Sequence, residues 1–123
     1  MAEPAVELRL ATLAPSGSSW MKVFTAWNLT VKEETDNTLK LRFYDGGSQG
    51  DERDFVRKMR AGQMDGAALT TTGLGMLVRQ VLVLSVPGVI EEYEQLDSVR
   101  AELGGRFERM FDAEGYTLLG WGD

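Results

Sequence analysis

The sequence predicts a single α/β domain, residues 1–123, with a doubly wound, mainly parallel sheet and helices on both faces. Three observations support this fold class. Short runs with strand periodicity alternate with longer helical patterns along the whole chain. The run Val81–Val86 is apolar throughout, which is typical of a central parallel strand. The length of 123 residues suits one domain with one core.

The first strand is predicted over Val6–Leu13, where apolar residues alternate with other residues. Ser18 or Ser19 then suits the N-cap of a helix that runs to about Thr35. Apolar residues recur in this helix at spacings of four, three and four, and we expect them to face the core: Trp20, Phe24, Trp27 and Val31. Trp20 is nearest the loop and could instead stack on a ligand.

A glycine-rich loop follows the second predicted strand, Leu39–Tyr44, and leads into a second helix. Its glycines allow positive φ and a close approach of the backbone to a partner: Gly46, Gly47 and Gly50. Asp51 is expected to be the N-cap of the helix, whose first turn is acidic. Phe55 belongs to the apolar face, while Lys58 and the neighbouring arginines form the solvated remainder. Gly62 is expected to end the helix.

The second half of the chain continues the alternation of strands and helices. Asp65-Gly66 forms a turn into a third strand, 67–69, and a short helix is expected from Thr72-Gly73 to Val78. The strand Val81–Val86 ends at Pro87-Gly88, and a long helix starts at Glu91 or Glu92. Gly104-Gly105 permits a kink in that helix, since each glycine costs about 1 kcal/mol relative to Ala. A last strand is predicted over Tyr116–Trp121 after the helix stop at Gly115.

Composition excludes several classes of function. The 13 basic and 19 acidic residues give a net charge of −6, which argues against a nucleic-acid partner. The chain contains neither His nor Cys, so Ser-His triads, thiol nucleophiles and most zinc sites are excluded. No apolar stretch approaches the ~20 residues that span a bilayer.

The glycine loop is a poor candidate for a phosphate site, although a helix N-terminus follows it; a structural turn and the lining of a small-molecule cleft are the favoured interpretations. It lacks both the GxGxxG pattern and the Lys-Ser/Thr pair of a P-loop. Asp51, Glu52 and Asp54 would repel a phosphate at the helix start and are better interpreted as capping residues. Because no nucleophile has a base beside it, we predict a non-enzyme without cofactor or metal.

Four segments together resemble a known family. They are ATLAPSGSSW, FYDGGSQGDERDFVRKMRAGQMDGAAL, VLSVPG and GYTLLGWGD. These segments are similar to the solute-binding proteins of TRAP transporters, the DctP type. The resemblance implies a type II periplasmic-binding fold with two α/β lobes, which delivers small organic acids to membrane permease subunits. It also implies a periplasmic location, with the signal peptide removed or omitted.

The resemblance covers a first-lobe segment only, without the later return of the chain that completes the sheet of that lobe. Its arginine partner for a solute carboxylate would belong to the second lobe. An incomplete lobe leaves an unpaired strand edge, and such edges recruit partners. We therefore expect a homodimer formed through the incomplete lobe.

The resemblance implies that the ligand-binding residues lie in loops after the strands. After the first strand they are Thr12, Ser16 and Ser18; after the second, Gly47 and Gln49; after the third, Thr70, Thr71 and Thr72. Trp121, near the implied hinge, could stack on a ligand or pack in the core. Two alternatives stay open: a self-associating engineered lobe that binds no ligand, and a flavodoxin-like protein that binds a cofactor.

Overall fold

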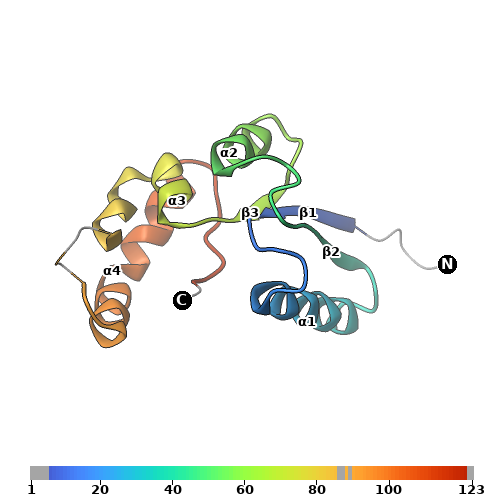
Figure 1. Ribbon diagram of the computed structural model, residues 1–123, viewed down its shortest axis with the longest axis horizontal. Helices are drawn as coiled ribbons and strands as arrows, with labels where there is room; N and C mark the ends of the chain where they lie inside the picture. Colours follow the sequence, from blue (N-terminus) through green and yellow to red (C-terminus); the bar gives the residue numbers. More distant parts are fainter. Residues whose placement is uncertain (1–5, 86–87, 89, 122–123) are drawn as a thin grey trace. The chain divides into compact units, whose positions relative to one another are not determined.

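The computed structural model describes residues 6–85, 88 and 90–121 (Figure 1). It contains two compact units, Met1–Leu69 and Thr70–Asp123, which we call the N-terminal and C-terminal units. Residues 1–5, which include the start of the chain, lie outside the described residues. A single domain over 1–123 stays a prediction.

A three-stranded parallel sheet forms the centre of the N-terminal unit. Its strands are β1 (Val6–Thr12), β2 (Leu39–Tyr44) and β3 (Gly66–Ala68), in the order β2-β1-β3. In the register, Leu10 of β1 lies opposite Phe43 of β2 and Gly66 of β3. Because β1 pairs with both neighbours in parallel, the carboxyl ends of all three strands lie at one edge of the sheet.

Helices cover the two faces of this sheet. Helix α1 (Ser19–Glu34) and helix α2 (Glu52–Arg60) lie on opposite sides of it (Figure 1). Phe24 of α1 stacks on Phe43, with ring centroids 4.7 Å apart. Phe55 of α2 is buried with Ala11 on the other face. The doubly wound α/β arrangement expected from the sequence is confirmed.

The apolar stripe of α1 is less buried than the sequence predicted. Trp20 is 43% exposed and Trp27 is 39% exposed, and no residue of α1 is buried. The expectation of core packing was wrong for Trp27, and Trp20, for which a ligand contact was the alternative, is also exposed. Phe43 offers a single aromatic surface to the helix, which Phe24 occupies at the shortest ring distance. A narrow sheet cannot cover the full stripe of a 16-residue helix.

A side chain from the middle of α1 and the side chain of its C-cap residue bond the outer edge of β2. Asn28 Oδ1 accepts a hydrogen bond from the Leu41 N–H at 2.8 Å, and Thr35 Oγ1 accepts one from the Leu39 N–H at 3.1 Å. These two amides have no strand neighbour on that side in the sheet order. The bonds therefore block the edge of β2 against pairing with another strand.

The C-terminal unit is built from helical segments. It contains α3 (Thr71–Leu77), the 3₁₀ helix η1 (Arg79–Ser85) and α4 (Tyr93–Ala113). Its buried cluster comprises Val78, Val81, Phe107 and Phe111. Helix α4 passes through Gly104-Gly105 without a break. It ends in a Schellman motif at Gly115, where the Tyr116 N–H bonds the Phe111 carbonyl at 2.9 Å.

Two predicted strands are absent from the described part of this unit. The Val81–Val86 prediction was wrong, because residues 79–85 form η1; Val86 and Pro87 lie outside the described residues. The Tyr116–Trp121 prediction was also wrong, because this segment has no regular structure. An apolar run of six residues fits a buried strand or a buried helix equally well. A strand also needs a neighbouring strand for its amides, and none occurs in the described part of this unit.

Asp65 fastens the turn before β3 to the central strand. Its carboxylate accepts hydrogen bonds from the Arg9 backbone N–H at 2.8 Å and from Arg9 Nε at 3.2 Å. The Asp65 N–H donates to the Arg9 carbonyl at 2.9 Å, so the residue extends the β1–β3 ladder. These bonds, with the backbone N–H of Arg9 as the largest cause, hold the pKa of Asp65 below its usual value.

The Arg9–Asp65 contact should make stability depend on pH in the acid range. Because folding lowers the pKa of Asp65, its stabilisation is present above the usual value of about 3.9 and is lost as the pH falls through the lowered value. Asp65→Asn should be less stable than wild type at pH 7, by a difference that shrinks below about pH 4. Urea unfolding at several pH values measures this.

Glu33→Gln is the matched control for this measurement, because Glu33 is an exposed carboxylate of α1 with no side-chain bond among the described residues. A stability difference between wild type and Asp65→Asn that stays constant from pH 7 to pH 3 would contradict the assignment.

Candidate functional site

The loops after β1 and β2 lie together at the carboxyl edge of the sheet. The Gly46 N–H donates to the Ala14 carbonyl at 2.8 Å, and the Gly47 N–H donates to the Thr12 carbonyl at 3.4 Å. In open α/β sheets, ligands bind outside the carboxyl ends of the strands. The structure thus brings together two of the loops that the sequence selected.

The residues selected after β1 differ in their environments. Thr12 is 4% exposed, and its Oγ1 accepts a hydrogen bond from the Ala14 N–H at 3.1 Å. Ser18 is the N-cap of α1, where its Oγ accepts from the Met21 N–H at 3.4 Å. Ser16 is exposed, and its hydroxyl makes no hydrogen bond within the described residues. Of the three, Ser16 is therefore the residue most open to a solute.

Positive φ angles give the glycine loop its shape. Gly46, Gly47 and Gly50 have φ values of 59°, 72° and 102°. A Cβ on Gly50 would overlap the Asp54 side chain. This position therefore requires glycine for two reasons, its positive φ angle and the lack of space for a side chain. The loop closes on itself through a hydrogen bond from the Gly50 N–H to the Gly47 carbonyl at 2.9 Å.

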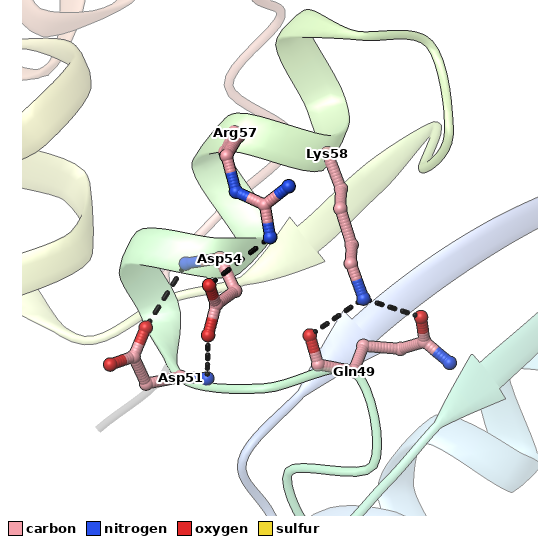
Figure 2. A network of polar contacts seen from close by, with 5 residues as sticks. All are labelled: Gln49, Asp51, Asp54, Arg57 and Lys58. Carbon is pink, nitrogen blue, oxygen red and sulfur yellow. Dashed lines mark hydrogen bonds and ion pairs between the residues drawn. The ribbon is translucent and has the colours of Figure 1, made fainter.

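A capping box joins this loop to α2 (Figure 2). The Asp54 N–H donates to Asp51 Oδ1, and the Asp51 N–H donates to Asp54 Oδ2, both at 3.0 Å. Arg57 Nη2 donates to Asp54 Oδ1 at 3.3 Å. The Asp51 backbone N–H is the largest cause of a lowered pKa at Asp54, and Arg57 adds to it. The predicted N-cap at Asp51 is confirmed, and both carboxylates serve the helix start.

Lys58 reaches back from α2 to the loop, which the sequence did not predict. Its Nζ donates to the Gln49 carbonyl at 2.9 Å and to Gln49 Oε1 at 3.0 Å (Figure 2). The helical pattern placed Lys58 on the solvated side of α2. No short-range signal reveals this contact, because it joins residues nine positions apart through a loop. Lys58 is thus the loop-contacting residue that the sequence interpretation missed.

The remaining selected residues belong to the C-terminal unit. Thr70 is the N-cap of α3 and makes no side-chain capping bond there, while Thr71 and Thr72 begin the helix. Trp121 packs against the buried cluster of that unit, with its ring centroid 5.9 Å from that of Phe107. Their binding roles stay predictions.

The chemistry available in these loops is hydrogen bonding. The N-terminal unit presents backbone groups, the Ser16 hydroxyl and the Gln49 amide at the ends of β1 and β2. Within the described ranges, no group of three or more His, Cys, Asp or Glu side chains is placed to hold a metal ion. None of the helices described is long and apolar enough to cross a membrane.

Comparison with known proteins identifies the family. Residues 10–123 match the model of bacterial extracellular solute-binding protein, family 7, which is named DctP. The chain belongs to this family. The resemblance seen in the four sequence segments is thereby confirmed.

Similar proteins extend this result. A TRAP periplasmic solute-binding protein from Ralstonia eutropha, with bound (S)-2-acetolactate, is 25% identical with a TM-score of 0.84; the match covers 94% of this chain and 38% of that one. A protein from Roseobacter denitrificans with bound β-D-glucuronate is 20% identical with a TM-score of 0.87, covering 96% and 39%. A solute-binding protein from Chromohalobacter salexigens is 24% identical over 101 residues, covering 81% and 30%.

The chain therefore spans between 30% and 39% of the length of these relatives. The two structural relatives named share the fold of the described chain, and both are TRAP periplasmic solute-binding proteins.

The capping box gives a direct test of how the glycine loop is held. Asp51→Ala removes the acceptor for the Asp54 N–H and should destabilise the protein by about 1 kcal/mol. Chemical denaturation followed by circular dichroism measures this. Arg53→Ala is the control, since Arg53 is exposed on the same helix turn and should change stability by less than about 0.5 kcal/mol. Equal losses in the two variants would argue against the capping role of Asp51.

Proposed function

We propose that the chain forms the first-lobe part of an extracytoplasmic solute-binding protein, which binds a small organic acid for a TRAP-type transporter. The observation that carries this proposal is the match of residues 10–123 to the DctP family model. The relatives with bound (S)-2-acetolactate and β-D-glucuronate support an acid as the class of solute.

The arrangement of the strand-end loops fits this function. A solute at the carboxyl edge of the sheet would meet backbone N–H groups and neutral polar side chains, which suit carboxylate and hydroxyl oxygens. We assign the contacts to the residues selected from the sequence: Thr12, Ser16, Ser18, Gly47, Gln49, Thr70, Thr71, Thr72 and Trp121. Because Thr12 and Ser18 already bond backbone amides, Ser16 and Gln49 are the side chains best able to add a bond to the solute.

The mechanism proposed is capture between two lobes. In a two-lobed binding protein, a solute that bridges both lobes stabilises the closed state. One lobe supplies half of the contacts, so this chain by itself should bind weakly. Membrane permease subunits are the proposed partners, the periplasm is the proposed location, and we propose no enzymatic activity.

Binding of acids is tested by isothermal titration calorimetry on the full-length protein. By this we mean the two-lobed protein of which we propose this chain to be the first-lobe part. The probes are (S)-2-acetolactate, D-glucuronate and D-erythronate, the last of which is bound to the related protein from Polaromonas. At least one should bind, and Ser16→Ala should weaken that Kd roughly 3-fold to 10-fold through the loss of one hydrogen bond. Ser98→Ala, which removes an exposed hydroxyl from α4, should leave Kd unchanged. Binding of none of these acids would contradict the proposed solute class.

Self-association is a second candidate property of the chain as it stands. The exposed apolar residues of α1 support it, with Val23 at 59% and Trp20 at 43% exposure. The edge of β3 opposite β1 also lacks a partner strand in the described sheet. We propose that a second copy of the chain covers these surfaces.

Val23→Lys should shift the 123-residue chain toward monomer, because it places a charge next to the exposed side chains of Trp20 and Trp27 on α1. Light scattering after size exclusion, over a range of concentrations, measures this. Thr25→Lys is the control: it adds the same charge to an exposed position on the other side of α1 and should leave the assembly unchanged. A wild-type chain that is monomeric at every concentration would contradict self-association.

A further inference from the structure

We propose that Lys58 is a positioning residue for solute binding. It turns the side-chain amide of Gln49 so that the NH2 group, rather than the amide oxygen, faces a bound solute. This inference rests on the proposed function, because it assigns a role within the same strand-end loop. It adds a requirement to that function: the solute must offer an acceptor oxygen to Gln49.

The orientation of the amide follows from the chemistry of the ammonium group. Lys58 Nζ lies 2.9 Å from the Gln49 carbonyl oxygen and 3.0 Å from Gln49 Oε1. An ammonium group has donors only, so it can bond the oxygen of the amide and not its NH2. The reversed amide would bring NH2 against the ammonium and lose one bond. The Gln49 nitrogen accordingly lies on the side of the amide away from Lys58 (Figure 2).

The NH2 group of Gln49 is available to a solute. It makes no hydrogen bond to any residue that the structure describes. Gln49 belongs to the loop after β2, which is bonded to the loop after β1 at the carboxyl edge of the sheet. In an α/β lobe a solute is expected to bind at this edge, so the NH2 group of Gln49 is a donor at the expected binding position.

Lys58 is firmly placed for this role. Its own carbonyl accepts the N–H groups of Gln63 at 2.8 Å and Met64 at 3.2 Å, which fixes its backbone at the end of α2. The other end of the same helix begins with the capping box at Asp51, two residues after Gln49. The Lys58–Gln49 bonds therefore close a loop that is already anchored at the helix start.

The charge of Lys58 strengthens the effect. Within the described ranges Lys58 makes no ion pair, whereas the neighbouring Arg57 pairs with Asp54. An ammonium bonded to Oε1 polarises the amide and makes its NH2 a better donor. Gln49 is thereby set to bind a carboxylate or hydroxyl oxygen and to disfavour an amine at this point.

The test titrates D-glucuronate, D-erythronate and (S)-2-acetolactate into the full-length wild-type protein and into three of its variants, two at Lys58 and one at Arg60. Lys58→Met should weaken the tightest of these Kd values roughly tenfold, because the amide is no longer held. Lys58→Arg keeps donors and a positive charge and should stay within about threefold of wild type. Arg60→Met is the matched control: it removes one charge from an exposed position of the same helix turn and should leave Kd unchanged.

Gln49→Glu separates the donor from the bond to Lys58. The glutamate can still accept from Lys58, but it presents an oxygen to the solute in place of NH2. Its affinity for these acids should fall by more than that of Lys58→Met. Equal or tighter binding by Gln49→Glu would overturn the proposal.

Nuclear magnetic resonance of the Gln49 side-chain amide reports on the geometry even where a variant changes stability. In the wild-type protein, the NH2 signals should shift on saturation with the acid that binds. Signals that do not move, or a Lys58→Met variant that folds and binds like wild type, would overturn the role of Lys58 while leaving the proposed function intact. A wild-type protein that binds none of the three acids would overturn both.

Discussion

The parallel pairing of β1 with both of its neighbours is the constraint on which the N-terminal unit depends. A parallel neighbour requires a crossover connection, and here α1 and α2 supply the two crossovers. Parallel pairing also sends every strand end to the same edge of the sheet. The loops after β1 and β2 therefore meet, and the two backbone hydrogen bonds between them follow from the topology. The sheet is small, but it is enough to place both loops.

The glycine loop shows how a flexible sequence becomes a defined surface. Glycines at positions 46, 47 and 50 can adopt the left-handed backbone angles of this loop, but glycine can also adopt many other angles, so these residues alone do not select one conformation. Three sets of bonds make the selection: the contacts to the loop after β1, the capping box at Asp51, and the two bonds from Lys58. Much of the cost of ordering the loop is thus met before a solute arrives, which favours binding.

The sequence predicted the local features of this unit well and the long-range ones poorly. The strand β2, the N-cap at Ser18 and the N-cap at Asp51 depend on neighbouring residues, and all three agree with the structure. The run at residues 81–85 failed, because its apolar pattern cannot say whether a partner strand exists. The contact of Lys58 with Gln49 was missed because it depends on the conformation of the loop and not on the residues next to Lys58 in the sequence. The family, by contrast, was accessible from short motifs, since those motifs encode the loop and cap chemistry directly.

The net charge of −6 does not prevent such a surface from holding an acid. Charges separated by more than about 8 Å are largely screened at physiological salt, so the local groups decide. Near the glycine loop, Asp51 accepts a backbone N–H, and Asp54 is bonded both by a backbone N–H and by Arg57. These carboxylates are thus partly neutralised by donors of their own helix. Lys58 is bonded to neutral oxygens only, so its charge is balanced by no carboxylate among the described residues. The loop consequently holds one ammonium group and several hydrogen-bond donors on an acidic chain, which is the local chemistry that the proposed binding of an organic acid needs.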